Sequence, residues 1–432
     1  MTSTISQEQN YNYIHIPGAI QPHGVLIALS LSLQIEQVSD NVEEFLSKKP
    51  EDLLNQPLHN LFGAEEIRAI EDLLVSTQHA SISPNYLKLT LNTPEGEKHF
   101  DATVHKSDRI IILELEPTLS RTEMSFVNFR SMIGDVIPQI QQTSKLSDFT
   151  RLVVDKVKDI TGFDRVMIFR FDASGAGSVI AEAKQEELEP YLGLHYPESD
   201  IPEPARKLYA RGLLRYIPDL NAHKSNLIPL NNPYTAQPLD LSDATLRSCD
   251  DCCVQYHQNM GVSALLVISL IQDQKLWGLI SCHNSTPKYL TSDIRTGCGF
   301  LGQIVSLELS NQIITEELDY KDKLKLLLSQ FVASISSADN FIDALIHPKP
   351  CLLDLVTAGG CAISLDNEIT LVGATPGVEE VRSLIEWSQN TIDDEPCASG
   401  DKVEPAIAAI TAPKACGPKS KAIAPATIEL GK

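Results

Sequence analysis

The stretch LRSCDDCCVQYHQNMGVSALLVISLI, residues 246–271, decides how the fold of this chain is interpreted. It opens with three cysteines within five positions, and none of the nine cysteines of the chain precedes them. Its last part, residues 260–271, is mostly apolar, but serines interrupt it and it is shorter than the roughly 20 residues of a membrane-spanning helix. We therefore expect a cysteine-rich turn, the start of a helix and then a buried strand.

Four apolar segments around this stretch predict a sheet domain, with strands at 165–172, 177–183, 264–273 and 275–284. Two segments with helical periodicity, at about 124–142 and 146–160, lead into it. Between its second and third strands lies a long segment, about 187–248, that is rich in Pro, Tyr and Asn and looks helical only at 204–212. Loops of this length inside a compact domain usually carry function.

A smaller domain precedes this one. Apolar and polar residues alternate at 87–91 and 111–115, which favours an antiparallel sheet with one covered face. Its five predicted strands are 24–30, 33–39, 87–93, 98–105 and 109–116. Both domains combine helices with antiparallel sheets, so the predicted fold class is α+β.

The C-terminal third begins with a long helical segment, from about 292 to 336, whose apolar positions follow roughly one stripe. Such a helix can join domains and pair with a second copy of itself. A hairpin is expected to turn at 366–367, and an amphipathic helix to follow at 378–390. Residues 401–432 hold eight alanines, four prolines and no aromatic residue, so the third domain is expected to be incomplete.

The charge balance argues against several classes of partner. The chain has 57 acidic and 35 basic side chains, a net charge of −22, which repels nucleic acids and anionic lipid surfaces. The N-terminus shows no basic region followed by an apolar run, so no signal peptide is expected and the cytoplasm is the predicted location. In that reducing compartment the cysteines are expected to be free, metal-bound or chemically used.

Four motifs resemble phytochromes, in the same order and at matching spacing, over roughly residues 12 to 400. They are IHIPGAIQPHG (14–24), YPESDIPEPARKLYARGLLRYIPD (196–219), the stretch quoted above, and KLWGLISCHNSTPKYL (275–290). The resemblance implies an N-terminal extension (1–17), a PAS domain (18–118), a bilin-binding GAF domain (123–308), a helical linker (309–337), a partial PHY domain (338–400) and a low-complexity tail (401–432). It also implies that residues 14–24 thread through a GAF loop and form a knotted fold.

The resemblance further implies a set of residues around a linear tetrapyrrole. Cys252 matches the cysteine that forms a thioether with the pigment, and Arg215 and Arg247 match the arginines that bind its propionates. Planar guanidinium suits carboxylate better than ammonium does. Asp200 matches an aspartate whose carbonyl faces the pyrrole nitrogens. The residues that match the surroundings of the outer ring are Tyr196, Tyr256 and His283.

Two residues depart from the family pattern. Cys253 stands where the family has a histidine hydrogen-bonded to the pyrrole nitrogens, and a thiol is a weaker partner that cannot buffer a proton near neutral pH. Phe169 replaces a tyrosine beside the outer ring. Both residues belong to the implied pigment site, and both are expected to weaken red/far-red switching or to make the pigment more fluorescent.

The implied function is a photoreceptor that binds a bilin covalently and senses red and far-red light. Phycocyanobilin is favoured over biliverdin, because biliverdin-binding relatives use a cysteine upstream of the PAS domain and no cysteine precedes Cys249. The expected partner is a second copy of the chain, through the helix after Thr291. No phosphate loop, kinase signature or nucleophile elbow is found in the sequence, so no enzymatic activity is expected.

Several alternatives stay open at this level. The thiol of Cys252 could be an inert buried group, the arginines could form surface ion pairs, and Asp200 could cap a helix. Neighbouring aspartates should raise the pKa of Cys252, whereas the helix start and Arg247 should lower it. A zinc site is conceivable from Cys249, Cys252, Cys253 and His257. Cys249 or Cys253 could add to the middle of the bilin, or the chain could be a PAS-GAF module for another small ligand or for dimerisation.

Overall fold

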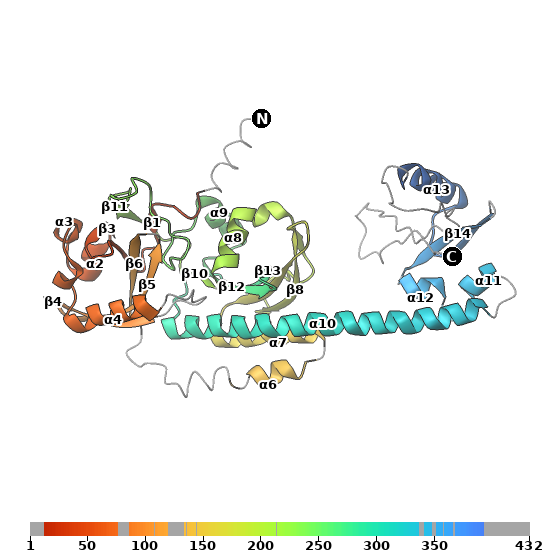
Figure 1. Ribbon diagram of the computed structural model, residues 1–432, viewed down its shortest axis with the longest axis horizontal. Coiled ribbons are helices and arrows are strands. Elements are labelled where there is room, and N and C mark those ends of the chain that lie inside the picture. Colours follow the sequence, from red (N-terminus) through yellow and green to blue (C-terminus); the bar gives the residue numbers. More distant parts are fainter. Residues whose placement is uncertain are drawn as a thin grey trace. The chain divides into compact units, whose positions relative to one another are not determined.

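The computed structural model describes residues 13–76, 86–107, 109–119, 134, 136–143, 145–212, 214–336, 341–347, 351–356, 358–365 and 368–392 of the 432-residue chain. The chain divides into two compact units, Met1–Ile314 and Thr315–Lys432. Helices and antiparallel sheets occur in both units, as the predicted α+β class requires (Figure 1).

The N-terminal sheet has seven antiparallel strands in the order β1-β11-β3-β2-β6-β5-β4. The five strands predicted from sequence are confirmed, and the remaining two are short. Strands β1 and β11 are Ala19–Ile20 and Ser225–Ile228, and the others are β2 (Val25–Leu29), β3 (Ile35–Ser39), β4 (Tyr86–Thr93), β5 (Gly96–Ser107) and β6 (Ile110–Pro117). The helices of this part are α2 (Val42–Leu46), α3 (Pro50–Leu53), η1 (Leu58–Asn60) and α4 (Ala64–Ser76).

The expectation that this sheet has one covered face is wrong. On one face, Val25 and Ile27 of β2 pack against the helices of the N-terminal domain. On the other face, Leu26 and Ala28 pack against apolar side chains of the segment 227–246, which comes from the second domain. Because successive side chains of a strand point to opposite faces, a central strand that is apolar throughout can be buried on both.

The N-terminal segment lies inside the long connection of the second domain. Strand β1 pairs with β11 on one side. On its other side, Ile20 forms a β-bridge with Arg247, Gln21 N donates to Leu246 O at 2.7 Å, and Ser248 N donates to Ala19 O at 3.3 Å. The segment predicted to be threaded therefore has neighbours from 225–228 and from 246–248. The knot itself stays a prediction.

The second sheet has six antiparallel strands in the order β10-β12-β13-β7-β8-β9. The four strands predicted from sequence are confirmed, and β9 and β10 are two short strands that were missed. Their bounds are β7 (Arg165–Phe171), β8 (Gly177–Lys184), β9 (His195–Tyr196), β10 (Leu214–Ile217), β12 (Ala264–Gln272) and β13 (Lys275–Asn284). The helices are α6 (Val136–Gln141), α7 (Leu146–Thr161), η2 (Glu198–Asp200), α8 (Glu203–Arg211), α9 (Asp251–Asn259) and α10 (Ser292–Ser336).

Helices cover both faces of the second sheet, with α7 and α10 on one side and α8 and α9 on the other (Figure 1). Strand β12 supplies Leu266 and Ile268 to the first face and Leu265 and Val267 to the second. Helix α10 approaches β12 closely at Gly302, where an added Cβ would lie 2.4 Å from Cγ2 of Ile268. The long helix predicted after Thr291 is confirmed.

The second unit contains α11 (Phe341–Ile346), α12 (Leu352–Val356), a hairpin of β14 (Gly360–Leu365) and β15 (Glu368–Gly373), and α13 (Val378–Ile392). The predicted hairpin and the helix after it are confirmed. A small core of Phe331, Leu345, Leu352, Cys361 and Ile363 holds this unit together. The tail predicted at 401–432 lies outside the described residues.

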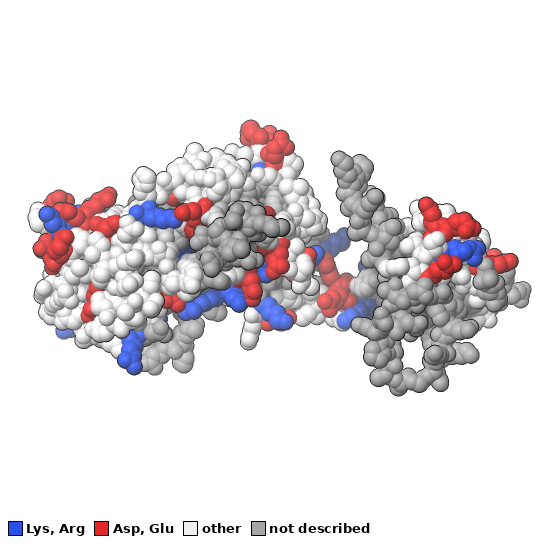
Figure 2. Space-filling model, turned by 90° about the horizontal axis from the view of Figure 1, so that it is seen from above, with Lys and Arg blue, Asp and Glu red and all other residues white. Residues whose placement is uncertain are grey.

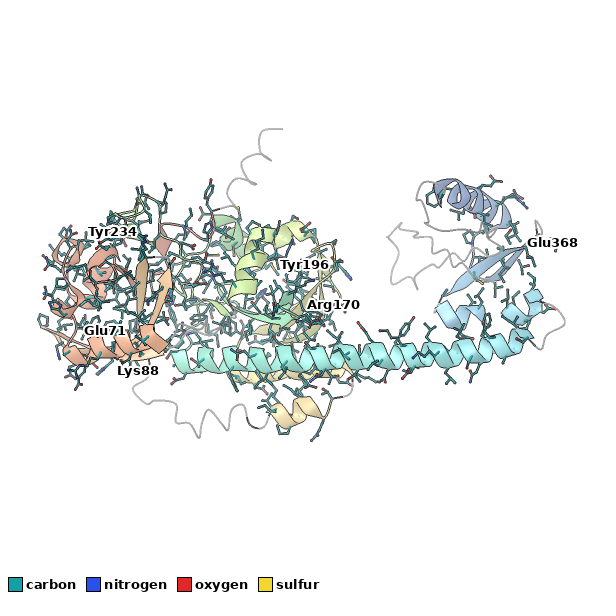
Figure 3. All side chains as sticks on the ribbon, viewed as in Figure 1. Glu71, Lys88, Arg170, Tyr196, Tyr234 and Glu368 are labelled. Atoms are coloured by element: carbon teal, nitrogen blue, oxygen red, sulfur yellow. The ribbon has the colours of Figure 1, made fainter. Side chains whose placement is uncertain are left out.

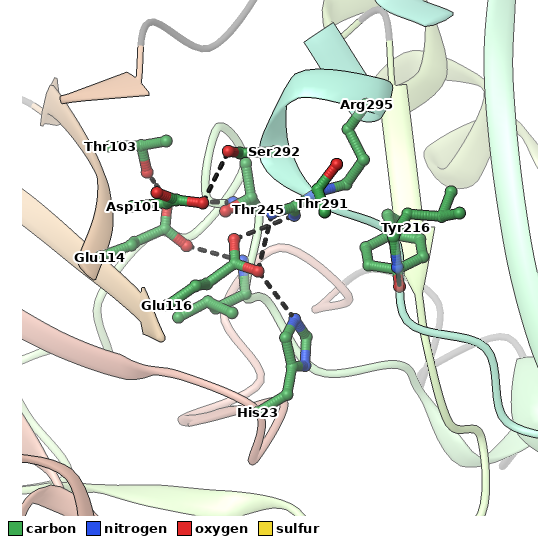
Figure 4. A network of polar contacts seen from close by, with 12 residues as sticks. His23, Asp101, Thr103, Glu114, Glu116, Tyr216, Thr245, Thr291, Ser292 and Arg295 are labelled. Atoms are coloured by element: carbon green, nitrogen blue, oxygen red, sulfur yellow. Dashed lines mark hydrogen bonds and ion pairs between the residues drawn. The ribbon is translucent and has the colours of Figure 1, made fainter. Parts of the chain in front are cut away.

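Acidic side chains on the N-terminal sheet are buried against the second domain (Figure 4). Glu114 accepts hydrogen bonds from Thr103 Oγ1 and from the backbone amides of Thr245 and Leu246, at 2.9, 3.1 and 2.6 Å. Asp101 accepts from Ser292 Oγ, at the start of α10, at 2.6 Å. Charge-assisted hydrogen bonds, which are stronger than neutral ones, offset the cost of burying these carboxylates.

Glu116 and Arg295 form a buried, bidentate ion pair between the first sheet and α10. The two nitrogen–oxygen distances are 2.9 and 2.8 Å, and His23 Nε2 lies 3.5 Å from the same carboxylate. Burial alone would raise the pKa of Glu116, but the charges of Arg295 and His23 and their hydrogen bonds outweigh it and lower the pKa to about 2. The ion pair is therefore fully formed at neutral pH.

The surface mixes both signs of charge. On the face that Figure 2 shows, basic side chains lie close to acidic ones over the described part of the chain. Among the described helices, none combines the length and the apolar character that crossing a bilayer requires.

The Glu116–Arg295 pair gives a stability prediction. Arg295→Met should lower the free energy of unfolding by about 3–5 kcal/mol, because Glu116 stays buried without a counter-charge. The double variant Arg295→Met, Glu116→Leu should recover most of that loss. Urea titration followed by circular dichroism measures both, and a loss within about 1 kcal/mol for the single variant would contradict the role of the pair.

The matched control is Arg211→Ala, which removes an exposed ion pair with Asp243 and should change stability by about 1 kcal/mol or less.

The Glu116–Arg295 ion pair also predicts that stability depends on pH. Because the folded pKa of Glu116 is about 2 and the ordinary value is 4.5, its contribution is complete above pH 4.5. It is lost as the pH falls from 4.5 towards 2.

Candidate functional site

A cavity of about 570 Å³ lies in the second domain, on the sheet face that α8 and α9 cover. Its volume is within the range of roughly 300–1,000 Å³ that is typical of small-molecule sites. Apolar side chains of the sheet, such as Val267 and Leu279, form its floor. All nine residues that the sequence assigned to a pigment site line it: Phe169, Tyr196, Asp200, Arg215, Arg247, Cys252, Cys253, Tyr256 and His283.

Two arginines line this cavity, and neither forms an ion pair with a carboxylate of the described residues. Arg215 Nη2 donates to the backbone oxygens of Arg247 and Ser248 at 2.6 and 3.2 Å. Nη1 of Arg247 is buried and has no hydrogen-bond partner among the described residues. Burial and the charge of Arg215 hold the pKa of Arg247 below its usual range. A buried, unpaired guanidinium is costly, so the site is built for an anion.

The start of helix α9 positions the cysteines. Asp250 is the N-cap, and its Oδ1 accepts a hydrogen bond from Cys253 N at 2.8 Å. Such a cap satisfies one of the amides that a helix start leaves open. Cys252 is in the first turn, partly exposed and lining the cavity, so its thiol is accessible from the cavity.

Cys249, Asp250 and Cys253 form a cluster in which one ligand-type atom of each lies within 4.8 Å of the others. The zinc set considered from sequence differs from this cluster, because Cys252 and His257 are not in it. The neighbouring Cys253 thiol lowers the pKa of Cys249, and the charges of Arg215 and Lys224 lower it further, while burial opposes them. The pKa of Cys253 is raised by the neighbouring Cys249 and by burial.

Aromatic side chains line the end of the cavity near α8. Tyr196 lies at the edge of the sheet beside α8 (Figure 3), and its ring centroid is 5.7 Å from that of Phe169. Phe169 sits directly over Gly177, where an added Cβ would lie 2.1 Å from its ring. The hydroxyl of Tyr256 donates to Asp200 Oδ2 at 3.4 Å, and burial raises the pKa of Tyr256.

His283 lies on β13 at the cavity wall and is buried. Its Nε2 is 3.0 Å from Ser281 Oγ, and its Nδ1 has no hydrogen-bond partner among the described residues. Burial, followed by the neighbouring His257, lowers its pKa well below the ordinary value. The imidazole is therefore neutral at pH 7 and keeps one ring nitrogen free to bond a ligand.

Some residues of the cavity wall were not predicted from the sequence. Tyr209 of α8 lines the cavity near the two arginines, and burial raises its pKa. His257 packs edge-on against His283, with ring centroids 5.5 Å apart, and its Nδ1 is 2.8 Å from Cys253 O. Ile14 reaches the cavity from the N-terminal segment. The periods of α8 and α9 could have indicated Tyr209 and His257, and the implied threading of residues 14–24 could have indicated Ile14.

Fold and site together define a small-molecule sensor built from a PAS-type and a GAF-type sheet domain. Family models match in the same order: a PAS fold at residues 9–118, a GAF domain at 145–313 and a phytochrome region at 324–419. The chain therefore belongs to the phytochrome family.

Known relatives support this assignment. The chain is 42% identical to cyanobacterial phytochrome A of Nostoc sp., over 88% of this chain and 50% of that protein. It is similar to a mutant chromophore-binding domain of the Stigmatella aurantiaca bacteriophytochrome in the Pr state, with 40% identity, a TM-score of 0.64 and coverage of 69% of this chain and 97% of that one. The wild-type photosensory core module from the same organism gives 37% identity and a TM-score of 0.70, over 86% and 74%. The chain spans about half the length of the curated relatives it matches.

The unpaired guanidinium predicts an unusual stability effect. Without pigment, Arg247→Met should leave the free energy of unfolding unchanged or raise it by about 1–3 kcal/mol, because it removes a buried polar group that lacks a partner. Thermal and urea unfolding of the purified chain measure this. A loss of several kcal/mol would mean that Arg247 has a structural partner.

The matched control is Arg165→Met on β7. Arg165 is buried, is paired with Glu182 and donates to Glu189 O at 2.7 Å. Its replacement should lower stability by about 3–5 kcal/mol, because Glu182 is left buried without its counter-charge.

Proposed function

We propose that this chain is a photosensory module that holds a linear tetrapyrrole in the cavity of the GAF domain, bound covalently to Cys252, and senses red and far-red light. The observation that carries the proposal is the pair of arginines. Arg215 and Arg247 line one cavity, Nη1 of Arg247 has no partner among the described residues, and the same cavity presents the free thiol of Cys252. A bilin has two propionates and an electrophilic side chain, so it fits both requirements.

In this proposal, different residues of the cavity bind different parts of the bilin. The guanidinium groups hold the propionates, and the donor left open on Arg247 gains a carboxylate partner. The sulfur of Cys252 adds to an exocyclic double bond of the first ring, and the thiol proton passes to the neighbouring carbon. The bound pigment supplies light absorption and isomerisation, and the side chains limit the space for rotation.

The opposite end of the cavity is suited to the last ring. Tyr196, Phe169 and Tyr256 supply aromatic surface, and the free Nδ1 of neutral His283 can bond a ring carbonyl when it carries the proton. Cys253 replaces an imidazole at the pyrrole nitrogens, so the protonation of the pigment depends on fewer buffering groups. Phycocyanobilin is the proposed bilin, because the attaching thiol lies in the GAF domain.

Pigment attachment is tested by co-expression of the chain with phycocyanobilin-synthesising enzymes. A denaturing gel stained with zinc should show a fluorescent band for the wild type and none for Cys252→Ala, because no thioether can form. Cys253→Ala is the matched control in the same helix turn and should keep the band.

Two outcomes would contradict the proposal. A wild-type chain that folds but stays colourless would favour a PAS-GAF module for another ligand. A band that persists in Cys252→Ala would move the attachment to Cys249 or Cys253.

We also propose that two copies pair through α10. Phe300, Leu307 and Ile314 are exposed on this helix and recur every seven residues, which is the spacing of a coiled-coil seam. Exposed apolar side chains at this spacing are typical of a surface that a second helix covers.

The double variant Leu307→Glu, Ile314→Glu should halve the mass measured by light scattering, because it places like charges in the seam. Leu31→Glu is the control, since Leu31 is also an exposed leucine but lies in the loop between β2 and β3. A wild-type chain that is already monomeric at micromolar concentration would overturn the dimer.

A further inference from the structure

Two thiols lie together at the wall of the cavity, and the proposed function assigns no reaction to either of them. Cys249 lies in the turn before α9, and Cys253 lies in the first turn of the helix. Both line the cavity and both are free. Their sulfur atoms lie within 4.8 Å of each other, close enough that side-chain rotation can bring them to bonding distance.

The charges around this pair favour a thiolate on Cys249. The Cys253 thiol lies beside it, and Arg215 and Lys224 add positive charge, whereas burial and Asp250 oppose ionisation. The net effect is a lowered pKa for Cys249 and a raised pKa for Cys253. A low-pKa thiol that is reachable from a cavity and has a second thiol beside it is the arrangement of a redox-sensitive cysteine pair.

We propose that Cys249 and Cys253 are a peroxide-reactive pair that closes a disulfide at the wall of the pigment cavity. The Cys249 thiolate attacks the peroxide O–O bond and becomes a sulfenic acid, and the hydroxide released takes up a proton to give water. The Cys253 sulfur then attacks the sulfenic sulfur, and the hydroxyl group leaves with the Cys253 proton as a second water. The sum is two thiols and hydrogen peroxide giving one disulfide and two waters.

The same geometry opposes a metal site. The cluster is flanked by Arg215, Arg247 and Lys224, and these positive groups repel a cation while they favour a thiolate. Cys252 is outside the cluster. It therefore stays available for the pigment, whichever state the other two thiols are in.

The disulfide would constrain the turn that presents Cys252. The N-cap Asp250 holds the backbone amide of Cys253, and the new bond would tie the residue before the cap to the third residue of the helix. It would also withdraw the Cys253 sulfur from His257 Nδ1, which now lies 3.6 Å away. The rate of pigment attachment is then expected to depend on redox state. This last consequence rests on the proposed function, whereas the thiol chemistry does not.

The test uses the full chain with Cys252→Ser and no pigment, so that a failure of pigment binding cannot affect it. After hydrogen peroxide treatment and alkylation of the remaining thiols, tryptic cleavage gives the peptide 248–275, in which only Cys249 and Cys253 remain. Mass spectrometry should find it unalkylated and two hydrogens lighter, and reduction should restore two alkylation sites. In a variant that also carries Cys249→Ser, the peptide should no longer lose two hydrogens.

A second measurement does not depend on disulfide closure. Cys249 should react with iodoacetamide at pH 7 several-fold faster than Cys351, and Cys253→Ala should slow it, because the neighbouring thiol that favours the Cys249 thiolate is lost. Equal rates for the two cysteines, or a peptide that stays a dithiol under peroxide, would overturn the proposal. So would thiols that react only after a chelator has removed a bound metal.

Discussion

The backbone of Arg247 is held in place by residues from the other domain, and the cavity of the second domain depends on this constraint. Ile20 bridges to Arg247, and the buried side chain of Gln21 donates to the carbonyl oxygens of Tyr216, Thr245 and Arg247 at 3.0, 3.2 and 3.3 Å. Arg215 donates to the same Arg247 carbonyl. The cationic wall of the cavity is thus assembled from two strand segments and an N-terminal segment, and the two sheet domains cannot be separated without disturbing it.

Strand β10 links this wall to the start of α10. Neighbouring side chains of a strand point to opposite faces, so Arg215 faces the cavity while Tyr216 faces the junction with the first sheet. The Tyr216 hydroxyl donates to Lys288 O and accepts from Leu290 N, both at 2.7 Å, just before α10 begins. Its ring also lies 5.0 Å from the guanidinium of Arg295. A ligand that moves Arg215 therefore acts one residue away from the contacts that anchor α10.

The cavity carries features that lower stability without a ligand. Nη1 of Arg247 and Nδ1 of His283 are buried without partners among the described residues, and each costs free energy in the empty state. Cys253 departs from the family pattern at the same cavity. It cannot buffer a proton as an imidazole does, and it lies beside Cys249.

The sequence by itself determined the strands, because strict alternation and apolar runs such as 111–115 and 264–271 leave few other structures possible. Family resemblance in the motifs around Arg215 and Cys252 also sufficed to choose the residues that line the cavity. Only the tertiary structure decided that segment 227–246 covers the second face of the first sheet, and that Gln21 bonds three carbonyl groups of the second domain. These contacts join residues about 200 positions apart, and no local period encodes them. The lack of a partner for Arg247 Nη1 among the described residues and the proximity of Cys249 to Cys253 likewise depend on which groups the folded chain brings close together.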